Sequence, residues 1–185
     1  MKARGFDPHR LHLEQFAREG ASLQGHWPQR NFSRLLSATV DDGAAPAEIV
    51  WAAHGEQRRV AGAEPQTWLR LEVSTTVALQ CQRCLQRVAQ PLAIERSMRF
   101  VRDEDEAARL DEESEDDVLA PGAWIDLHDL VEDELILALP LVPRHEQCPQ
   151  PLVPPPQVAE LDDDLEPEPH PFAALAALRG PKPNH

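Results

Sequence analysis

One stretch of alternating side chains, residues 68–81, constrains the fold of this chain more than any other feature. Leu69, Leu71, Val73, Val77 and Leu79 are apolar, and the residues between them are mostly polar or small. Because successive side chains of a β-strand point to opposite faces, this period predicts a strand with one buried face. Residues 88–102 repeat the pattern, so the two stretches are expected to pair as a hairpin.

The turn of this hairpin carries Cys81 and Cys84, and a second pair with the same spacing, His145 and Cys148, follows much later in the chain. A structural zinc ion takes four nitrogen or sulfur ligands, so the two pairs together make a candidate zinc site. The sequence does not show whether the pairs converge. Three reduced thiols without a metal therefore stay open as the alternative.

A Cys-x-x-Cys is also the motif of thiol-redox enzymes. Their catalytic dithiol uses a helix N-terminus, whose dipole lowers the pKa of the first thiol. Here the motif stands between two expected strands, with no helical pattern after it and with Gln82 and Arg83 between the cysteines. A redox enzyme is therefore kept as the weaker alternative, although Arg83 would stabilise a thiolate.

Other patterns predict helices beside the sheet. We expect short helices over 8–19 and 32–40, and strands near 22–25 and 49–53. Consecutive strands with short links favour an antiparallel meander. The fold class predicted for residues 1–148 is therefore α+β, an antiparallel sheet flanked by helices and either open or closed into a barrel.

The clearest helix signal begins at Asp126. This residue is a good N-cap, and Ile125 and Leu130 hold the positions of a hydrophobic staple. Pro140 ends the helix, because it cannot donate a backbone hydrogen bond. Glu134 falls on the apolar stripe, where we expect its carboxylate at the rim of the core.

Charge is distributed unevenly along the chain. The 185 residues carry a net charge of −14, and residues 103–117 alone hold ten acidic residues and one Arg. Such blocks are usually solvated, so this stretch is predicted to be a disordered, mobile loop. Residues 149–170 are rich in Pro and acids and indicate a linker. An apolar face over 171–180 predicts a short C-terminal helix, docked on its own domain or bound to a partner.

Three cysteines, two of them close together, do not make the disulfide framework of a secreted protein. No apolar run approaches the length of a transmembrane helix, and no signal sequence is recognisable. We therefore expect a soluble protein of a reducing compartment. No phosphate-binding glycine loop and no catalytic triad order is present, which argues against a small-molecule substrate.

Arginine supplies all but two of the 18 basic residues. Guanidinium groups bind phosphate bidentately, so arginines along the hairpin are candidates for a surface that binds RNA. Few aromatic residues are interleaved, so contacts to the RNA backbone are expected to dominate over base stacking. Pairing with the acidic stretch is the alternative role. The candidate RNA-binding residues are Arg83, Arg87, Arg96, Arg99 and Arg102.

Three segments carry a resemblance to the bacterial YceD family, the large ribosomal RNA subunit accumulation proteins. They are Cys81–Leu85 after a long strand, Val131–His145 with its Leu-Pro-Leu-Val-Pro-Arg-His ending, and the tail Pro171–Arg179. They come in the family's order, with an acidic variable stretch between the first two. The chain departs from the family at His170, where Asn often precedes the tail, and this affects only the expected cap of the tail helix.

The resemblance implies a non-enzymatic role in the synthesis, processing or stability of 23S ribosomal RNA and in assembly of the large ribosomal subunit. It also implies a cytoplasmic location and ribosomal RNA or a pre-50S particle as partner. It does not supply a zinc site, which is inferred from the two residue pairs alone. The alternative to direct RNA binding is an adaptor whose acidic segments bind basic ribosomal proteins.

Overall fold

A long antiparallel hairpin of β4 (Gln66–Gln80) and β5 (Arg87–Phe100) forms the centre of the structure, as the alternating pattern predicts. The computed structural model describes residues 5–40, 47–62, 64–113, 117–120 and 122–149. The expected C-terminal helix over 171–180 and all of the expected linker except Pro149 lie outside the described residues.

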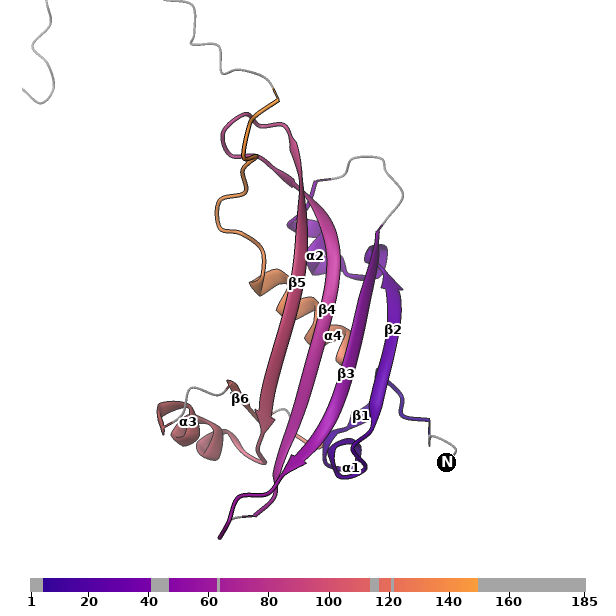
Figure 1. Ribbon diagram of the computed structural model, residues 1–185, viewed down its shortest axis with the longest axis vertical. Coiled ribbons are helices and arrows are strands. Elements are labelled where there is room, and N and C mark those ends of the chain that lie inside the picture. Colours follow the sequence, from indigo (N-terminus) through magenta and orange to yellow (C-terminus); the bar gives the residue numbers. More distant parts are fainter. Residues whose placement is uncertain (1–4, 41–46, 63, 114–116, 121, 150–185) are drawn as a thin grey trace, which may run out of the picture. The chain divides into compact units, whose positions relative to one another are not determined.

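The hairpin belongs to a five-stranded sheet with the order β2-β3-β4-β5-β6, shown in Figure 1. Strands β2 (Ser22–Pro28), β3 (Glu48–Arg58), β4 and β5 form the expected antiparallel meander. Strand β6 (Asp117–Leu119) joins the other side of β5 in parallel. Within the described residues the sheet is open, with β2 and β6 at its edges, so it does not close into a barrel.

One face of the sheet carries the core, and helices cover that face. The helices are α1 (Leu13–Arg18), α2 (Ser33–Ser37) and α4 (Leu127–Leu137), with a short 3-10 turn (Gln29–Asn31) before α2. Figure 1 shows α2 and α4 behind the sheet, and the fully buried Leu69, Leu71 and Leu135 belong to one apolar cluster. Gly55 lets α1 approach closely, because a Cβ there would lie 2.6 Å from a ring carbon of Phe16.

A two-stranded ribbon of β1 (Leu11–His12) and β7 (Trp124–Ile125) ties the N-terminal segment to the start of α4. Asp126 caps α4 as expected, and its carboxylate accepts a 2.8 Å hydrogen bond from the His128 backbone N–H. Glu134 lies at the rim of the core, as expected, and pairs with Arg96 at 3.2 Å. No helix within the described part of the chain is long and apolar enough to cross a membrane.

The acidic stretch differs from the expected loop, because residues 104–113 form helix α3 (Glu104–Glu113). Three acidic residues occupy its first turn, where the helix dipole favours negative charge. The Asp103 carboxylate also accepts a hydrogen bond from the Glu106 backbone N–H at 2.8 Å, which satisfies a free amide of that turn. The loop was predicted from the charge density alone. That prediction did not take into account that acidic residues in the first turn stabilise a helix.

Candidate metal centre

A tight turn at the end of the β4–β5 hairpin positions the first two cysteines. The backbone N–H of Cys81 donates to the Gln86 carbonyl at 2.9 Å, and that of Leu85 donates to the Cys81 carbonyl at 2.8 Å. Leu85 has a φ of 60°, in the left-handed region that few residues other than glycine adopt. This backbone reversal folds the chain so that Cys81 and Cys84 face the same side.

The segment that follows α4 brings the other pair to this turn. The Gln82 backbone N–H donates to the Pro143 carbonyl at 2.9 Å, which fixes the segment against the turn. Nε2 of His145 bonds the Arg87 carbonyl at 2.8 Å. Because a carbonyl only accepts, this bond places the proton on Nε2 and leaves the lone pair of Nδ1 directed at the cysteines.

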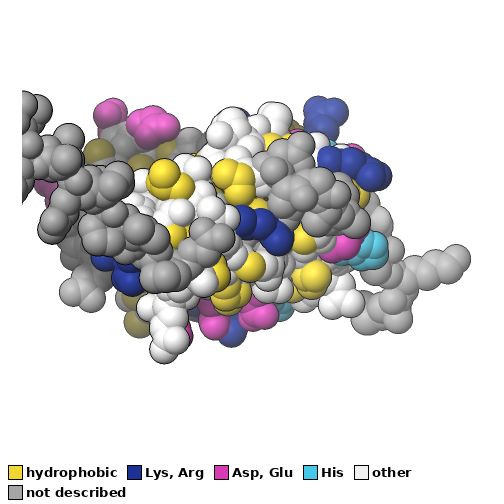
Figure 2. All heavy atoms as spheres, turned by 90° about the horizontal axis from the view of Figure 1, so that it is seen from above, with side chains coloured by type: hydrophobic (Ala, Val, Ile, Leu, Met, Phe, Trp, Pro, Cys, Tyr) yellow, Lys and Arg dark blue, Asp and Glu magenta, His cyan; other side chains and the backbone are white. Residues whose placement is uncertain are grey.

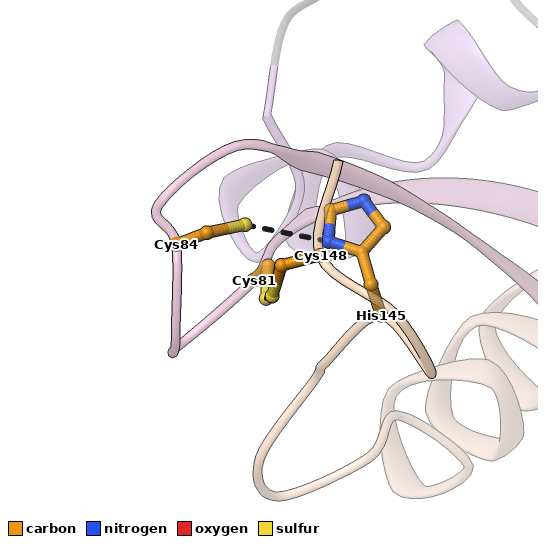
Figure 3. A group of neighbouring side chains, drawn as sticks. All are labelled: Cys81, Cys84, His145 and Cys148. Carbon is orange, nitrogen blue, oxygen red and sulfur yellow. Dashed lines mark hydrogen bonds between the residues drawn. The ribbon is translucent and has the colours of Figure 1, made fainter. Parts of the chain in front are cut away.

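The four side chains converge, as Figure 3 shows. Their ligand atoms all lie within 4.8 Å of one another, and they come from the hairpin turn and from the segment after α4. The sulfurs of Cys81 and Cys148 are 4.0 Å apart, and the Cys84 sulfur lies 3.5 Å from Nδ1 of His145. The two pairs that are far apart in the sequence thus form one Cys3His group that can hold a metal ion.

The spacing of this group fits a tetrahedral ion. Zinc–sulfur and zinc–nitrogen bonds of about 2.3 and 2.0 Å require about 3.8 Å between two sulfurs and about 3.5 Å between sulfur and nitrogen. The observed 4.0 Å and 3.5 Å are close to these distances. Cys81 is fully buried and the other three side chains are partly buried, as is usual in a closed structural site.

The electrostatics of the group favour a thiolate at Cys81 and disfavour one at Cys148. Burial raises the pKa of Cys81, but backbone N–H groups of Cys84, His145 and Arg83 and the His145 side chain outweigh it and lower that pKa to about 5. Burial and the neighbouring sulfurs of Cys84 and Cys81 raise the pKa of Cys148 to about 11. A divalent cation would relieve this opposition, because thiolates bind metal in their deprotonated form.

Two of the candidate RNA-binding residues lie at this end of the molecule. Arg83 is exposed within the turn, and Arg87 begins β5. Arg144, exposed beside His145, belongs to the segment after α4, so three arginines lie on the two segments that carry the Cys3His group. Figure 2 looks onto this end and shows basic side chains between hydrophobic and uncharged ones.

The other three candidates lie further along β5 or beyond it. Arg96 pairs with Glu134 of α4 at 3.2 Å and with Asp117 of β6 at 3.6 Å. Arg102, past the end of β5, lies 4.0 Å from Glu14. Arg99 is half-buried near the same end of the strand. The structure therefore does not bring the five arginines together on one surface.

Sequence reasoning passed over two residues that the structure makes prominent. Arg144 adjoins a proposed ligand, and that position next to His145 was the signal that could have identified it. Glu132 is a buried acid, 4% exposed, whose carboxylate accepts hydrogen bonds from the backbone N–H groups of Arg34 and Leu35 at 2.8 and 3.1 Å. No local pattern identifies Glu132, since its partners are far away in the sequence.

Known proteins match the part of the chain that builds this group. The model of the family "Large ribosomal RNA subunit accumulation protein YceD" matches residues 69–179, which is more than half of the chain. The chain belongs to the YceD family. The matched region of this YceD-family chain includes both residue pairs of the Cys3His group, and the resemblance noted in three sequence segments is thereby confirmed.

A curated relative extends this comparison. The large ribosomal RNA subunit accumulation protein YceD of Haemophilus influenzae is 40% identical over 109 residues, which cover 58% of this chain and 63% of that protein. The aligned region thus spans less than two thirds of the relative's length. No solved structure matches the chain.

Proposed function

We propose that this YceD-family chain is a non-enzymatic, cytoplasmic factor for the accumulation of 23S ribosomal RNA and assembly of the large ribosomal subunit. The observation that carries the proposal is the family match over residues 69–179, together with a relative named for large ribosomal RNA subunit accumulation. The family's name describes RNA accumulation and no catalysed reaction. The Cys3His group lies within the matched region, where it brings the hairpin turn and the segment after α4 together.

The proposed contact with RNA is the tip surface, defined as Arg83, Arg87 and Arg144 around the Cys3His group. Among the described residues, Arg83 and Arg144 have no ion-pair partner in the structure, and both are exposed. Guanidinium groups bind phosphate oxygens bidentately, and their planar fork loses less side-chain freedom per hydrogen bond than a lysine ammonium does. Arg96 and Arg102 are left out of this surface, because carboxylates of Glu134 and Glu14 already neighbour them.

Zinc is the metal proposed for the Cys3His group. Three sulfurs and one imidazole are a donor set typical of structural zinc, and a closed set of four protein ligands leaves no position for catalysis. The ion would join the hairpin turn to the segment after α4 and so hold Arg83, Arg87 and Arg144 in one place. Native mass spectrometry should show one zinc per chain, lost on addition of a chelator and in Cys148→Ser. A wild-type protein expressed with zinc that carries none would contradict the assignment.

The geometry also bears on the redox alternative. The dithiol lies in a strand–strand turn, away from any described helix N-terminus, and a third thiol and an imidazole surround it. These features support a metal ligand set over an exchanging dithiol, since a redox pair needs an accessible first sulfur and Cys81 is fully buried. Disulfide-exchange activity that is lost in Cys84→Ser would favour the redox enzyme.

Ultraviolet crosslinking in cells tests the proposed partner. Wild-type chain should crosslink to 23S ribosomal RNA, and a variant with Arg83→Ala, Arg87→Ala and Arg144→Ala should lose most of this signal at equal protein level. A matched variant with Arg58→Ala, Arg99→Ala and Arg102→Ala removes the same charge elsewhere and should keep it. Crosslinks to ribosomal proteins without any to RNA would show that RNA contact is not direct.

A further inference from the structure

The face of the sheet that α1, α2 and α4 leave uncovered contains an open hollow of about 1130 Å³ across β2, β3, β4 and β5. In Figure 1 this face of the sheet is turned toward the viewer, and α2 and α4 lie behind the strands. No described helix packs over the hollow. The hollow is therefore part of neither the core under the helices nor the tip surface.

Short side chains form the floor of the hollow. Val50, Ser74 and Ala93 are aligned across neighbouring strands in one row, and Ala52 stands in the next row. Val50 is 53% exposed although it is apolar. Exposed apolar side chains in a shallow, open site favour contact with another polypeptide over capture of a small molecule, which needs an enclosed pocket.

Acidic side chains border this floor. Glu72 and Glu95 are directly opposite each other on β4 and β5, and Glu48 lines the hollow from the start of β3. Like charges directly opposite on paired strands repel each other. One cation, Arg70, lies between them, 3.1 Å from Glu72 and 2.6 Å from Glu95. Three carboxylates and one guanidinium leave the border net negative.

We propose that this face, the acidic hollow of Glu48, Glu72 and Glu95 around Val50, Ser74 and Ala93, binds a Lys/Arg-rich polypeptide segment of a partner protein. Charge selects this occupant. Phosphates of RNA and the acidic residues 160–168 of the chain itself would be repelled, and a second copy would bring the same negative charge. Small residues between the basic ones would fit the floor, and a guanidinium of the partner would contact the carboxylates of Glu72 and Glu95 in the way that Arg70 does.

The proposal goes beyond the tip surface and does not depend on RNA binding there. Both can operate at once, because the hollow and the tip surface use different residues and opposite charges. Loss of peptide binding would leave the RNA crosslinks of the tip surface unchanged, and loss of those crosslinks would leave peptide binding unchanged. Failure of one proposal is thus distinguishable from failure of the other.

Fluorescence anisotropy with the full chain and a labelled peptide of alternating Arg and Ala tests the hollow. Glu72→Gln with Glu95→Gln should weaken binding about tenfold, the loss expected for two exposed ion pairs that act together. The matched control, Glu104→Gln with Glu112→Gln on α3, removes the same charge and should leave the affinity within about twofold. Equal weakening by both variants would mean attraction to the net charge and would overturn the site.

A second variant tests the floor without a change of charge. Ala93→Trp fills the hollow from an exposed position and should also weaken peptide binding, while circular dichroism and the melting temperature report whether the fold is kept. Ser74→Gln, also exposed, serves the same purpose should Ala93→Trp not fold. Unchanged peptide affinity in a folded floor variant would overturn the proposal, and so would equal binding of a peptide of alternating Glu and Ala.

Discussion

Glu132 shows how a single buried acid joins two elements that are distant in the sequence. It extends from α4 to the start of α2, where its carboxylate accepts the backbone N–H groups of Arg34 and Leu35 and, at 2.9 Å, the Nε of Arg34. The first amides of a helix have no partner within the helix, so this carboxylate acts as a cap from another element. Removal of such a group leaves buried donors unsatisfied.

We predict that Glu132→Ala lowers the free energy of unfolding by about 3 kcal/mol, the typical cost of losing one partner of a buried, hydrogen-bonded pair. Urea denaturation measures this. Asp133→Ala is the matched control, since Asp133 also binds Arg34 but is half-exposed, and it should cost less than about 1 kcal/mol. Equal losses of unfolding free energy in the two variants would mean that the burial of Glu132 adds nothing to its contribution to stability.

The same residue predicts a pH dependence. Burial raises the pKa of Glu132, but the N–H groups of Leu35 and Arg34 and the Arg34 guanidinium outweigh it and hold the pKa below the ordinary 4.5. A lowered pKa in the folded state means that the contribution is present above the ordinary value and is lost as pH falls through the lowered one. The stability difference between wild type and Glu132→Gln should therefore shrink below pH about 4.5. A difference that grows on acidification would contradict the assignment.

At the scale of elements, the predictable parts are those with a strong local signal. The alternation in β4 and β5 and the Asp126 cap of α4 each depend on neighbours in the sequence, and the structure confirms all three. Helix α3 and the three-residue β6 were missed, because a polar helix buries little and a short parallel strand has no pattern of its own. Strand β6 is determined by its tertiary pairing with β5, which no local pattern predicts.

The residues of the candidate metal centre could be proposed from the sequence, but their convergence could not. Spacing identified Cys81, Cys84, His145 and Cys148, since each pair is three residues apart. Their convergence depends on the path of the chain after α4, which is fixed by single hydrogen bonds such as that from Gln82 to the Pro143 carbonyl. Contacts between residues that are distant in the sequence produce no periodic pattern from which they could be predicted.

Removal of the proposed zinc ion should loosen the hairpin turn and the segment after α4 before the rest of the sheet. A ligand at one hundred times its dissociation constant stabilises the folded state by about 2.7 kcal/mol, so a chelator should lower the melting temperature by several degrees. Hydrogen exchange should accelerate first at residues 81–87 and 143–148. His26→Ala, an exposed histidine away from the centre, should respond like wild type, whereas Cys148→Ser should no longer respond. An unchanged wild-type melting temperature would count against a structural ion.

At the scale of the whole molecule, the sheet separates surfaces of opposite charge. Along β5, Arg87 of the tip surface and Glu95 of the hollow are eight positions apart, which at about 3.3 Å per residue is about 26 Å. The tip surface at one end is rich in Arg, whereas the hollow on the uncovered face is bordered by Glu72 and Glu95. This separation would let one chain contact a phosphate backbone and a basic polypeptide at the same time, as the role proposed above in assembly of the large ribosomal subunit requires.

Because the basic tip and the acidic face are separate, the salt dependence of RNA binding tests whether RNA contacts the tip surface alone. Each phosphate that a protein neutralises on a single strand releases counterions and adds about 0.7 to the steepness of log K against log salt. Arg83→Ala with Arg144→Ala should therefore flatten the slope by about 1.4 and weaken binding at low salt. Arg99→Ala with Arg102→Ala removes the same charge at the other end of β5 and should leave the slope unchanged. Equal flattening by the two variants would mean that RNA follows the whole strand, and the division into a basic tip and an acidic face would be wrong.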